Sequence, residues 1–137
     1  MSTVTVSMDM DVPASTIWLI WSDLKNSPKW DTDVVNCDMD GEFEVGTKGI
    51  CNLKNGLRMT IVIKEINFGK SWSNSAKLLG MTLIFNHWLD ITSSKTCKVT
   101  HQVDVSLVKF RLCRVMLRYI LKRSLNKSLM NMKKITH

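Results

Sequence analysis

The chain passes from strand to helix within residues 96–133, TCKVTHQVDVSLVKFRLCRVMLRYILKRSLNKSLMNMK. Apolar and polar residues alternate as far as Val105, and a period of two is typical of a half-buried strand. From Lys109 to Lys133 the apolar and basic residues instead recur at helical spacing, which predicts one long helix. Such a helix of about 25 residues is roughly 37 Å long and can lie across a whole sheet.

The residues at the start of the chain predict a strand followed by two short helices. Residues 3–12 alternate strictly between apolar and polar, and Pro13 suits the first position of the helix that follows. The apolar face of that helix is formed by Ile17, Ile20, Trp21 and Leu24. Trp18 lies off this face, so we expect it at the surface, either exposed or at the entrance of a site. A second helical turn is expected at residues 29–31, after a break at 26–28.

Strand and turn signals fill the middle of the chain, from residue 34 to residue 105. Asp40-Gly41 and Asn55-Gly56 are typical of hairpins, and Asn55-Gly56 predicts a type I′ turn in which both central residues have positive φ. Six consecutive strands are expected at residues 34–40, 47–53, 57–65, 70–78, 82–91 and 96–105. With the first strand they predict an α+β protein with a curved, seven-stranded antiparallel sheet.

A cavity is expected where the terminal helix meets this sheet. Seven strands in meander order curve strongly because sheets twist, and only the terminal helix is long enough to cover the apolar face. One helix does not fill a deep, curved trough. The remaining space would be concave and mostly apolar, which is the usual character of a small-molecule site.

Composition narrows the class of protein. The 137 residues are about the size of one domain, and we expect a single ligand-binding domain over residues 1–137. The four cysteines form no C-x-x-C pair and no apolar leader is seen, so reduced thiols in the cytoplasm are expected. No charge-free stretch approaches the roughly 20 residues of a membrane span. We predict no cofactor.

Short motifs then occur along the chain in order: Val12-Pro13, Ile17-Trp18, Trp21-Ser22-Asp23, Trp30-Asp31, Gly46-Thr47, Gly49, Glu65, Phe85-x-His87-x-Leu89 and Lys98-Val99-Thr100-His101. This ordered set resembles the polyketide cyclase/dehydrase and lipid-transport family of the START-like, or SRPBCC, superfamily. The resemblance covers nearly the whole chain and implies the helix-grip fold, in which a curved sheet wraps around a C-terminal helix. Because that superfamily holds lipid carriers, hormone receptors and cyclases, the resemblance implies no particular activity.

His87 and His101 are predicted to face each other inside the trough. Each lies on the apolar face of its strand, and a hairpin centred on Ser94 sets them opposite each other, with Phe85 opposite Val103. Opposed Cβ atoms are about 5 Å apart, so the two rings could touch. They could close the core as a hydrogen-bonded pair, orient a ligand hydroxyl or carbonyl, or transfer protons. A zinc site is disfavoured because no third ligand has suitable spacing.

Other inward-facing residues are candidates for the cavity wall. Trp72 and Asn74 face inward by alternation, and Trp30 belongs to the segment that would close one end. Asn52 is expected inward because a two-residue turn at 55–56 pairs it with Met59. The indoles could equally belong to a filled core, whereas inward amides need partners, which a ligand or trapped water could provide. The predicted ligand-binding residues are Trp30, Asn52, Met59, Trp72, Asn74, Phe85, His87, His101, Leu112, Met116 and Tyr119.

The terminal helix carries the positive charge of the chain. Residues 105–137 contain nine Lys and Arg and no Asp or Glu. A basic stripe is formed by Arg111, Arg114, Arg118 and Lys122, and the opposite, apolar side by Leu112, Cys113, Met116, Leu117, Tyr119 and Ile120. Beyond residue 122 the two sides mix, so we expect the second half of the helix to be looser. The stripe could be a solvated face, a surface for transient contact with anionic membranes or, least favoured without a recognition fold, a nucleic-acid contact.

The preferred interpretation is a non-catalytic carrier or binding protein for a small hydrophobic or amphipathic molecule of lipid, polyketide or aromatic type. In this interpretation the apolar side of the terminal helix is the lid of the cavity. The first alternative is a cyclase or dehydratase that uses His87 and His101 for proton transfer. The second is an interaction module that places the basic helix on acidic lipid or another polyanion.

Overall fold

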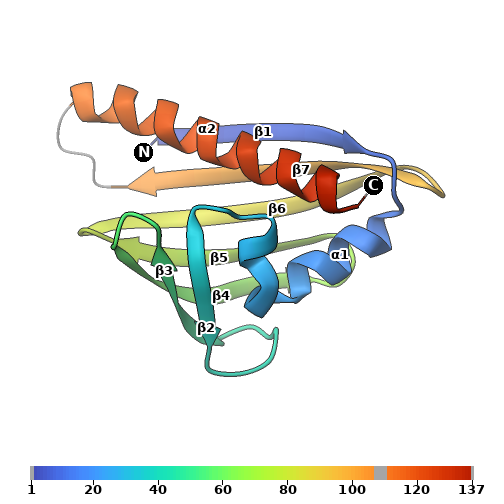
Figure 1. Cartoon of the computed structure of the whole chain (residues 1–137), viewed down its shortest axis with the longest axis horizontal. Coiled ribbons are helices and arrows are strands. Elements are labelled where there is room, and N and C mark those ends of the chain that lie inside the picture. Colours follow the sequence, from blue (N-terminus) through green and yellow to red (C-terminus); the bar gives the residue numbers. More distant parts are fainter. Residues whose placement is uncertain (1, 107–110, 137) are drawn as a thin grey trace.

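The long terminal helix lies along a curved sheet in the computed structural model of the protein, which describes residues 2–106 and 111–136 (Figure 1). Side chains are described for residues 3–106 and 115–136. The elements are β1 (Ser2–Met10), α1 (Ala14–Ser22), the 3-10 helix η1 (Leu24–Lys29), β2 (Val34–Met39), β3 (Lys48–Leu53), β4 (Arg58–Asn67), β5 (Ser71–Leu78), β6 (Met81–Ser93), β7 (Thr96–Ser106) and α2 (Arg111–Ile135). Their order and strand ends agree closely with the prediction.

The seven strands form one antiparallel sheet in the order β1-β7-β6-β5-β4-β3-β2. β1 and β2 follow each other in sequence and yet form the two edges, because α1 and η1 carry the chain from one edge to the other. The predicted alternation in β1 is confirmed, since Val4, Val6 and Met10 are buried. α2 lies mainly against β1 and β7, and its C-terminal end reaches η1 (Figure 1). The predicted α+β architecture is therefore confirmed.

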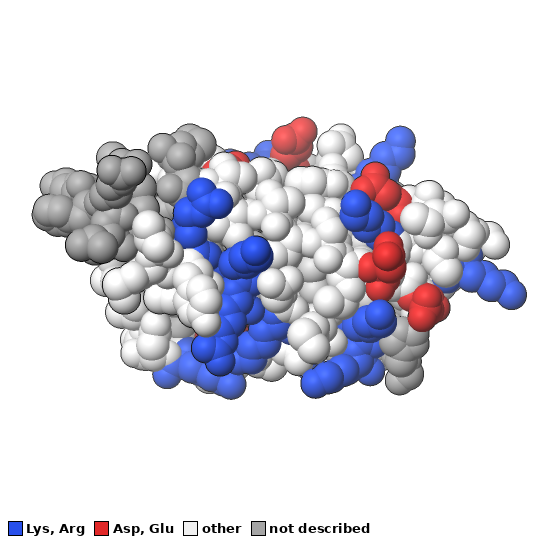
Figure 2. Space-filling view, turned by 90° about the horizontal axis from the view of Figure 1, so that it is seen from above, with Lys and Arg blue, Asp and Glu red and all other residues white. Residues whose placement is uncertain are grey.

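The described residues of the basic stripe lie on the surface, as the amphipathic pattern predicted. Arg118 and Lys122 are exposed, whereas the side chains of Arg111 and Arg114 lie outside the described residues. Figure 2 views the molecule from the side of α2 and β1, and shows Lys and Arg spread among uncharged side chains. Asp and Glu are fewer in this view and lie mostly toward its right-hand end.

The second short helix begins earlier than predicted. η1 starts at Leu24 and includes Pro28, so the expected break at residues 26–28 is in fact a 3-10 turn. The side-chain amide of Asn26 donates to the Asp23 carboxylate at 2.7 Å, which supports the change from α1 to η1. Leu24 and Ser27 are buried beneath this turn, and the chain then passes through Trp30 into β2.

The turn between β3 and β4 differs from the predicted type I′ turn. Gly56 has positive φ but Asn55 does not, and the Leu53 N–H bonds to the Leu57 carbonyl at 2.8 Å across a three-residue loop. This extra loop residue shifts the pairing by one, so Met59 lies opposite Cys51 instead of Asn52. A one-residue shift exchanges the faces of a strand.

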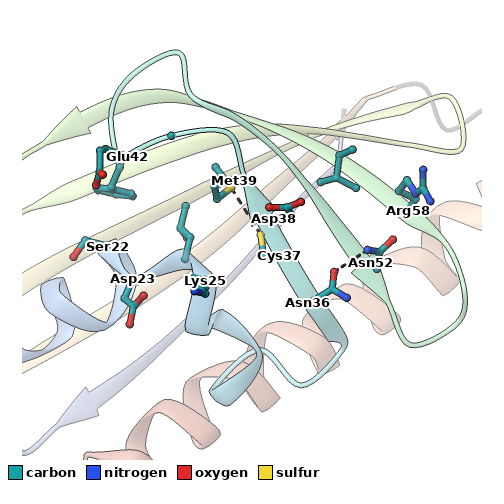
Figure 3. A pocket seen from close by; sticks show the side chains of 14 residues that line it. Ser22, Asp23, Lys25, Asn36, Cys37, Asp38, Met39, Glu42, Asn52 and Arg58 are labelled. Atoms are coloured by element: carbon teal, nitrogen blue, oxygen red, sulfur yellow. Dashed lines mark hydrogen bonds between the residues drawn. The ribbon is translucent and has the colours of Figure 1, made fainter.

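The prediction that Asn52 faces inward is therefore wrong. Asn52 pairs with Arg58 on the outer face of the sheet, and its amide donates to the Asn36 side chain at 2.7 Å (Figure 3). Met59 keeps its inward orientation and is partly buried next to Cys51.

Trp18 is buried, contrary to the prediction that it lies at the surface. Its indole is 5% exposed and contacts the rings of Trp21, Phe43 and Phe68 at centroid distances of 6.3, 5.9 and 5.4 Å. Phe43 belongs to the loop after β2 and Phe68 to the turn after β4. These loops fold over α1, so a helical wheel of α1 alone places Trp18 incorrectly.

The two halves of α2 pack in the opposite way to the prediction. Met116, Tyr119 and Ile120 are 65%, 68% and 55% exposed, so they are not the buried lid expected from the sequence. In the second half, which was expected to be looser, Leu129 and Met132 are completely buried. The inward ridge consists of Leu117, Leu121, Leu125, Ser128 and Met132, at spacings of three and four. Neither described helix combines the length and apolar character that a membrane span requires.

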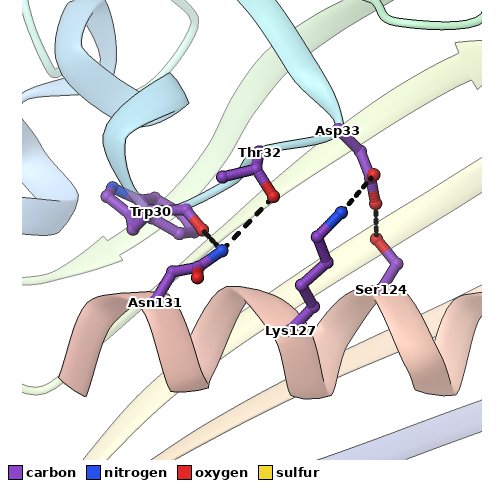
Figure 4. Close-up of polar contacts among 6 residues, drawn as sticks. All are labelled: Trp30, Thr32, Asp33, Ser124, Lys127 and Asn131. Atoms are coloured by element: carbon purple, nitrogen blue, oxygen red, sulfur yellow. Dashed lines mark hydrogen bonds and ion pairs between the residues drawn. The ribbon is translucent and has the colours of Figure 1, made fainter. Parts of the chain in front are cut away.

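The second half of α2 is fixed by polar contacts to the segment between η1 and β2 (Figure 4). The Ser124 hydroxyl donates to the Asp33 carboxylate at 2.6 Å, and the Lys127 ammonium lies 3.4 Å from the same group. One turn further on, the Asn131 amide donates to the Trp30 carbonyl at 3.2 Å. These contacts join the second half of α2 to the segment that leads into the edge strand β2.

Candidate ligand-binding site

Aromatic and imidazole rings meet on the concave face of the sheet, beneath the second half of α2. α1 supplies Trp21, β5 supplies Trp72, β6 supplies His87, β7 supplies His101, and the segment after η1 supplies Trp30. All five are at least nine-tenths buried. The predicted register is confirmed, because His87 lies directly opposite His101 with ring centroids 5.0 Å apart. Trp30 and Trp72 are buried there as well, so rings fill this end of the trough.

Both nitrogens of His101 are used to join secondary-structure elements. The indole N–H of Trp21 donates to Nε2 at 3.1 Å, so Nε2 carries no proton. Nδ1 lies 3.3 Å from the Ser128 hydroxyl, whose own proton goes to the Leu125 carbonyl at 2.7 Å. Nδ1 is therefore the protonated nitrogen. His101 connects α1, β7 and α2 as a neutral ring, which is the arrangement of a core histidine.

His87 has a free acceptor nitrogen. Its Nδ1 lies 3.2 Å from the Trp72 carbonyl, which only accepts, so Nδ1 carries the proton. The ring stacks on the Trp72 indole at 3.9 Å and 5°. Nε2 is left as an acceptor with no hydrogen-bond partner among the described residues.

Burial keeps both histidines neutral. Desolvation lowers the pKa of His87 to about 3, with the hydrogen bond to the Trp72 carbonyl acting weakly in the other direction. Desolvation also lowers the pKa of His101 well below its ordinary value, and His87 adds to this effect. The two pKa values move in the same direction, so the arrangement does not produce the acid and base of a proton-transfer pair. Catalysis by these residues stays a prediction without support from the geometry.

Several inward polar groups lack partners within the described part of the chain. The indole N–H groups of Trp30 and Trp72 are fully buried and make no hydrogen bond. Asn74 faces inward as predicted and is 6% exposed; its amide makes no hydrogen bond with a described residue but, unlike the two indole N–H groups, it is not fully buried. An unsatisfied buried donor or acceptor costs about 1–3 kcal/mol. Trapped water or a bound molecule could supply the missing partners.

Apolar side chains next to Asn74 are only partly buried. Four of them belong to the strands β4, β5 and β6, and two belong to α2. The set consists of Met59, Leu78, Met81, Phe85, Leu117 and Leu121. Phe85 pairs with Asn74, and Leu78 with Met81, so these side chains continue along the same inward face. Partly buried apolar side chains therefore lie along the same inward face as Asn74.

The predicted ligand-binding residues fall into three groups in the structure. Trp30, Trp72, Asn74, Phe85, His87, His101 and Met59 lie on the concave side. Asn52, Met116 and Tyr119 do not, and the side chain of Leu112 lies outside the described residues. Sequence reasoning missed the role of Ser128 because a serine in an amphipathic helix carries no sign of a buried partner. Its place in the ridge of spacing three and four was the available signal.

Comparison with known proteins supports the fold. No family model matches the chain, and no curated protein matches it in sequence. A START superfamily protein from Mycobacterium smegmatis matches with a TM-score of 0.80 and 12% identity, over 96% of this chain and 94% of that one. Norcoclaurine synthase from Thalictrum flavum, in complex with dopamine and hydroxybenzaldehyde, matches with a TM-score of 0.77 and 13% identity, over 98% of this chain and 86% of that one. Major latex-like protein 151 from Panax ginseng matches with a TM-score of 0.73 and 16% identity, over 97% of this chain and 95% of that one.

The chain therefore has the START-like, helix-grip fold, as the sequence motifs predicted. At identities of 12–16% the likeness shows the fold alone. What the concave face binds has to be argued from its own residues.

Proposed function

We propose that this protein binds a small apolar or amphipathic molecule between the concave face of the sheet and α2, as a carrier or binding protein without catalysis. The observation that supports this proposal is the row of unpaired polar groups beside half-buried apolar side chains. Asn74, the Trp72 indole N–H and Nε2 of His87 supply donors and an acceptor. A ligand with a hydroxyl or carbonyl group on an apolar body matches this combination.

The ring cluster limits where such a ligand can lie. Trp30, Trp72, His87 and His101 already occupy the end of the trough beneath the second half of α2. The ligand would instead lie toward Phe85, with its polar group near Asn74 and its apolar body along the partly buried side chains. The histidines would then border the site and orient the ligand through His87 alone.

Asn74→Leu tests this proposal. Because Asn74 makes no hydrogen bond with a described residue, replacing its amide should not lower the melting temperature of the unliganded protein. The same change should weaken binding of hydroxyl- or carbonyl-bearing compounds about 10-fold, as expected for about 1.4 kcal/mol. Thermal shift and calorimetry with a panel of fatty acids, sterols and phenols provide both measurements.

Asn52→Leu is the matched control, because Asn52 lies on the outer face of the sheet. It should leave ligand affinity unchanged. Equal affinities of the wild type and Asn74→Leu for every polar ligand in the panel would place the site elsewhere.

We propose in addition that the outer face of the first half of α2 contacts anionic membranes. We define this α2 outer face by its exposed residues Val115, Met116, Arg118, Tyr119, Ile120, Lys122 and Arg123. Apolar, aromatic and basic side chains together are typical of helices that bind the membrane interface. Arg118, Lys122 and Arg123 form no ion pair with any described residue, so their charge is available to lipid phosphates.

Vesicle sedimentation tests this contact. The protein should bind vesicles that contain phosphatidylserine more tightly than vesicles of phosphatidylcholine alone, and added salt should weaken the binding. Each Lys or Arg near an anionic surface is worth about 1 kcal/mol, so Arg118→Gln/Lys122→Gln/Arg123→Gln should lose roughly 100-fold in affinity.

The control removes the same charge from another face. Lys48→Gln/Lys64→Gln/Lys77→Gln changes exposed lysines of β3, β4 and β5 and should retain most of the binding. Equal losses in the two triple variants would mean that net charge alone attracts the protein. Self-association through the exposed apolar residues, measured by light scattering, would assign the face to a second copy instead.

A further inference from the structure

Two thiols face each other across the edge of the sheet. Cys37 in β2 and Cys51 in β3 are directly opposed in the antiparallel register. Both are free thiols, and both are buried on the concave side. Opposed residues of antiparallel strands have Cα atoms about 4.5–5.5 Å apart, within the roughly 4.4–6.8 Å that a disulfide spans. We propose that Cys37 and Cys51 are a redox-sensitive pair, which a peroxide converts into a disulfide between β2 and β3.

The two thiols are not equivalent. Hydrogen bonds from the Cys51 thiol and then from the Ser27 hydroxyl lower the pKa of Cys37 against the effect of burial. The same hydrogen bond, in which Cys51 is the donor, raises the pKa of Cys51. Because Cys37 also lines a surface pocket and Cys51 does not, Cys37 is the thiol that an oxidant reaches first, and Cys51 is the thiol that resolves the product.

The proposed reaction has two steps. The Cys37 thiolate attacks one oxygen of hydrogen peroxide, the O–O bond breaks, and the released hydroxide takes a proton to give water and a Cys37 sulfenic acid. The Cys51 sulfur then attacks the Cys37 sulfur, and the S–O bond breaks with release of a second water. Two thiols are oxidised and one peroxide is reduced, so the protein loses two hydrogen atoms.

A surface pocket gives an oxidant access to Cys37. The pocket has a volume of about 910 Å³ and is lined by residues of β2, of β3 and of the junction between α1 and η1 (Figure 3). Cys37 is among them, with its Sγ 3.9 Å from the Met39 thioether, whereas Cys51 does not line the pocket. A small oxidant therefore reaches the Cys37 sulfur through this pocket.

Cys97 lacks these features and serves as an internal control. It is completely buried in β7, burial raises its pKa, and its opposed residues are Met10 and Ile91. No described thiol lies across from it. A reaction of Cys97 at the rate of Cys37 would show that oxidation is unselective.

The test is treatment of the full chain with hydrogen peroxide, followed by intact mass and peptide mapping. We expect a loss of two hydrogen masses and a crosslink between the peptides that contain Cys37 and Cys51, reversed by dithiothreitol. Cys51→Ser should stop at the sulfenic acid, which dimedone traps on Cys37, and Cys97→Ser should behave as the wild type. Cys51→Ala replaces Cys51→Ser if the hydroxyl disturbs folding. Retention of both thiols under peroxide, or a disulfide that joins another pair, overturns the proposal.

Discussion

The neutral histidine pair makes the stability of the folded protein depend on pH. His101 accepts from Trp21 and donates to Ser128, and His87 stacks on Trp72. An ordinary histidine has a pKa near 6.5, and burial lowers both values below it. Between the folded and the unfolded pKa the unfolded chain binds more protons, so acid favours unfolding. The contribution of His87 to stability is complete above about pH 6.5 and decreases as the pH falls toward about 3, and His101 acts in the same direction.

The pH dependence of stability gives a prediction at this scale. The free energy of unfolding of the wild type should decrease between pH 6 and pH 4, and His87→Gln should reduce the slope by up to about 1.4 kcal/mol per pH unit. Chemical denaturation at a series of pH values measures this slope even if the variant is less stable.

Asp31 provides a control of opposite sign. Burial, and then the neighbouring Asp33 carboxylate, raise the pKa of Asp31 to about 6, so the folded state holds this proton more tightly. The ionised form of Asp31 destabilises the folded state, and this destabilisation decreases as the pH falls from about 6 to about 4. Asp31→Asn should make the acid loss steeper. A slope that His87→Gln leaves unchanged would mean that another group causes the acid sensitivity.

The two halves of α2 have different roles at the scale of the element. The second half inserts Leu125, Leu129 and Met132 into the core and bonds to the segment after η1. The first half presents apolar and basic residues to the surroundings. The sequence predicted the helix and its basic face, but the helical wheel placed the buried side incorrectly. The wheel detects separation of polar and apolar residues, and that separation is clearer in the half that is exposed.

Alanine substitutions distinguish the two halves. Leu129→Ala removes a fully buried side chain and should lower the free energy of unfolding by about 2–5 kcal/mol. Ile120→Ala, the counterpart in the first half, should change it by less than about 0.5 kcal/mol. Urea denaturation measures both. Losses of similar size would restore the sequence-based expectation that the first half of α2 is a packed lid.

At the scale of the whole molecule, the prediction of the fold rested on the order of the secondary-structure elements along the chain. Alternation and turn signals predicted all seven strands, and the His87–His101 register followed because both strands have one apolar face. Asn52 was misplaced because one extra residue in the loop at 54–56 exchanges the faces of β3. Trp18 was misplaced because Phe43 and Phe68 come from distant parts of the chain. Such long-range contacts are not encoded in a local period, and they also determine how much of the trough is filled.

Native mass spectrometry of the freshly purified full chain tests the central claim, that the trough beside Asn74 and Phe85 binds a small molecule. We expect a population heavier than the bare chain by the mass of a small apolar or amphipathic compound. Extraction with organic solvent should remove the added mass and lower the melting temperature, and returning the extracted compound should restore both. Asn74→Leu should carry less of it than Asn52→Leu. A spectrum with the bare chain alone, together with no stabilisation by any compound in the ligand panel, would contradict the account.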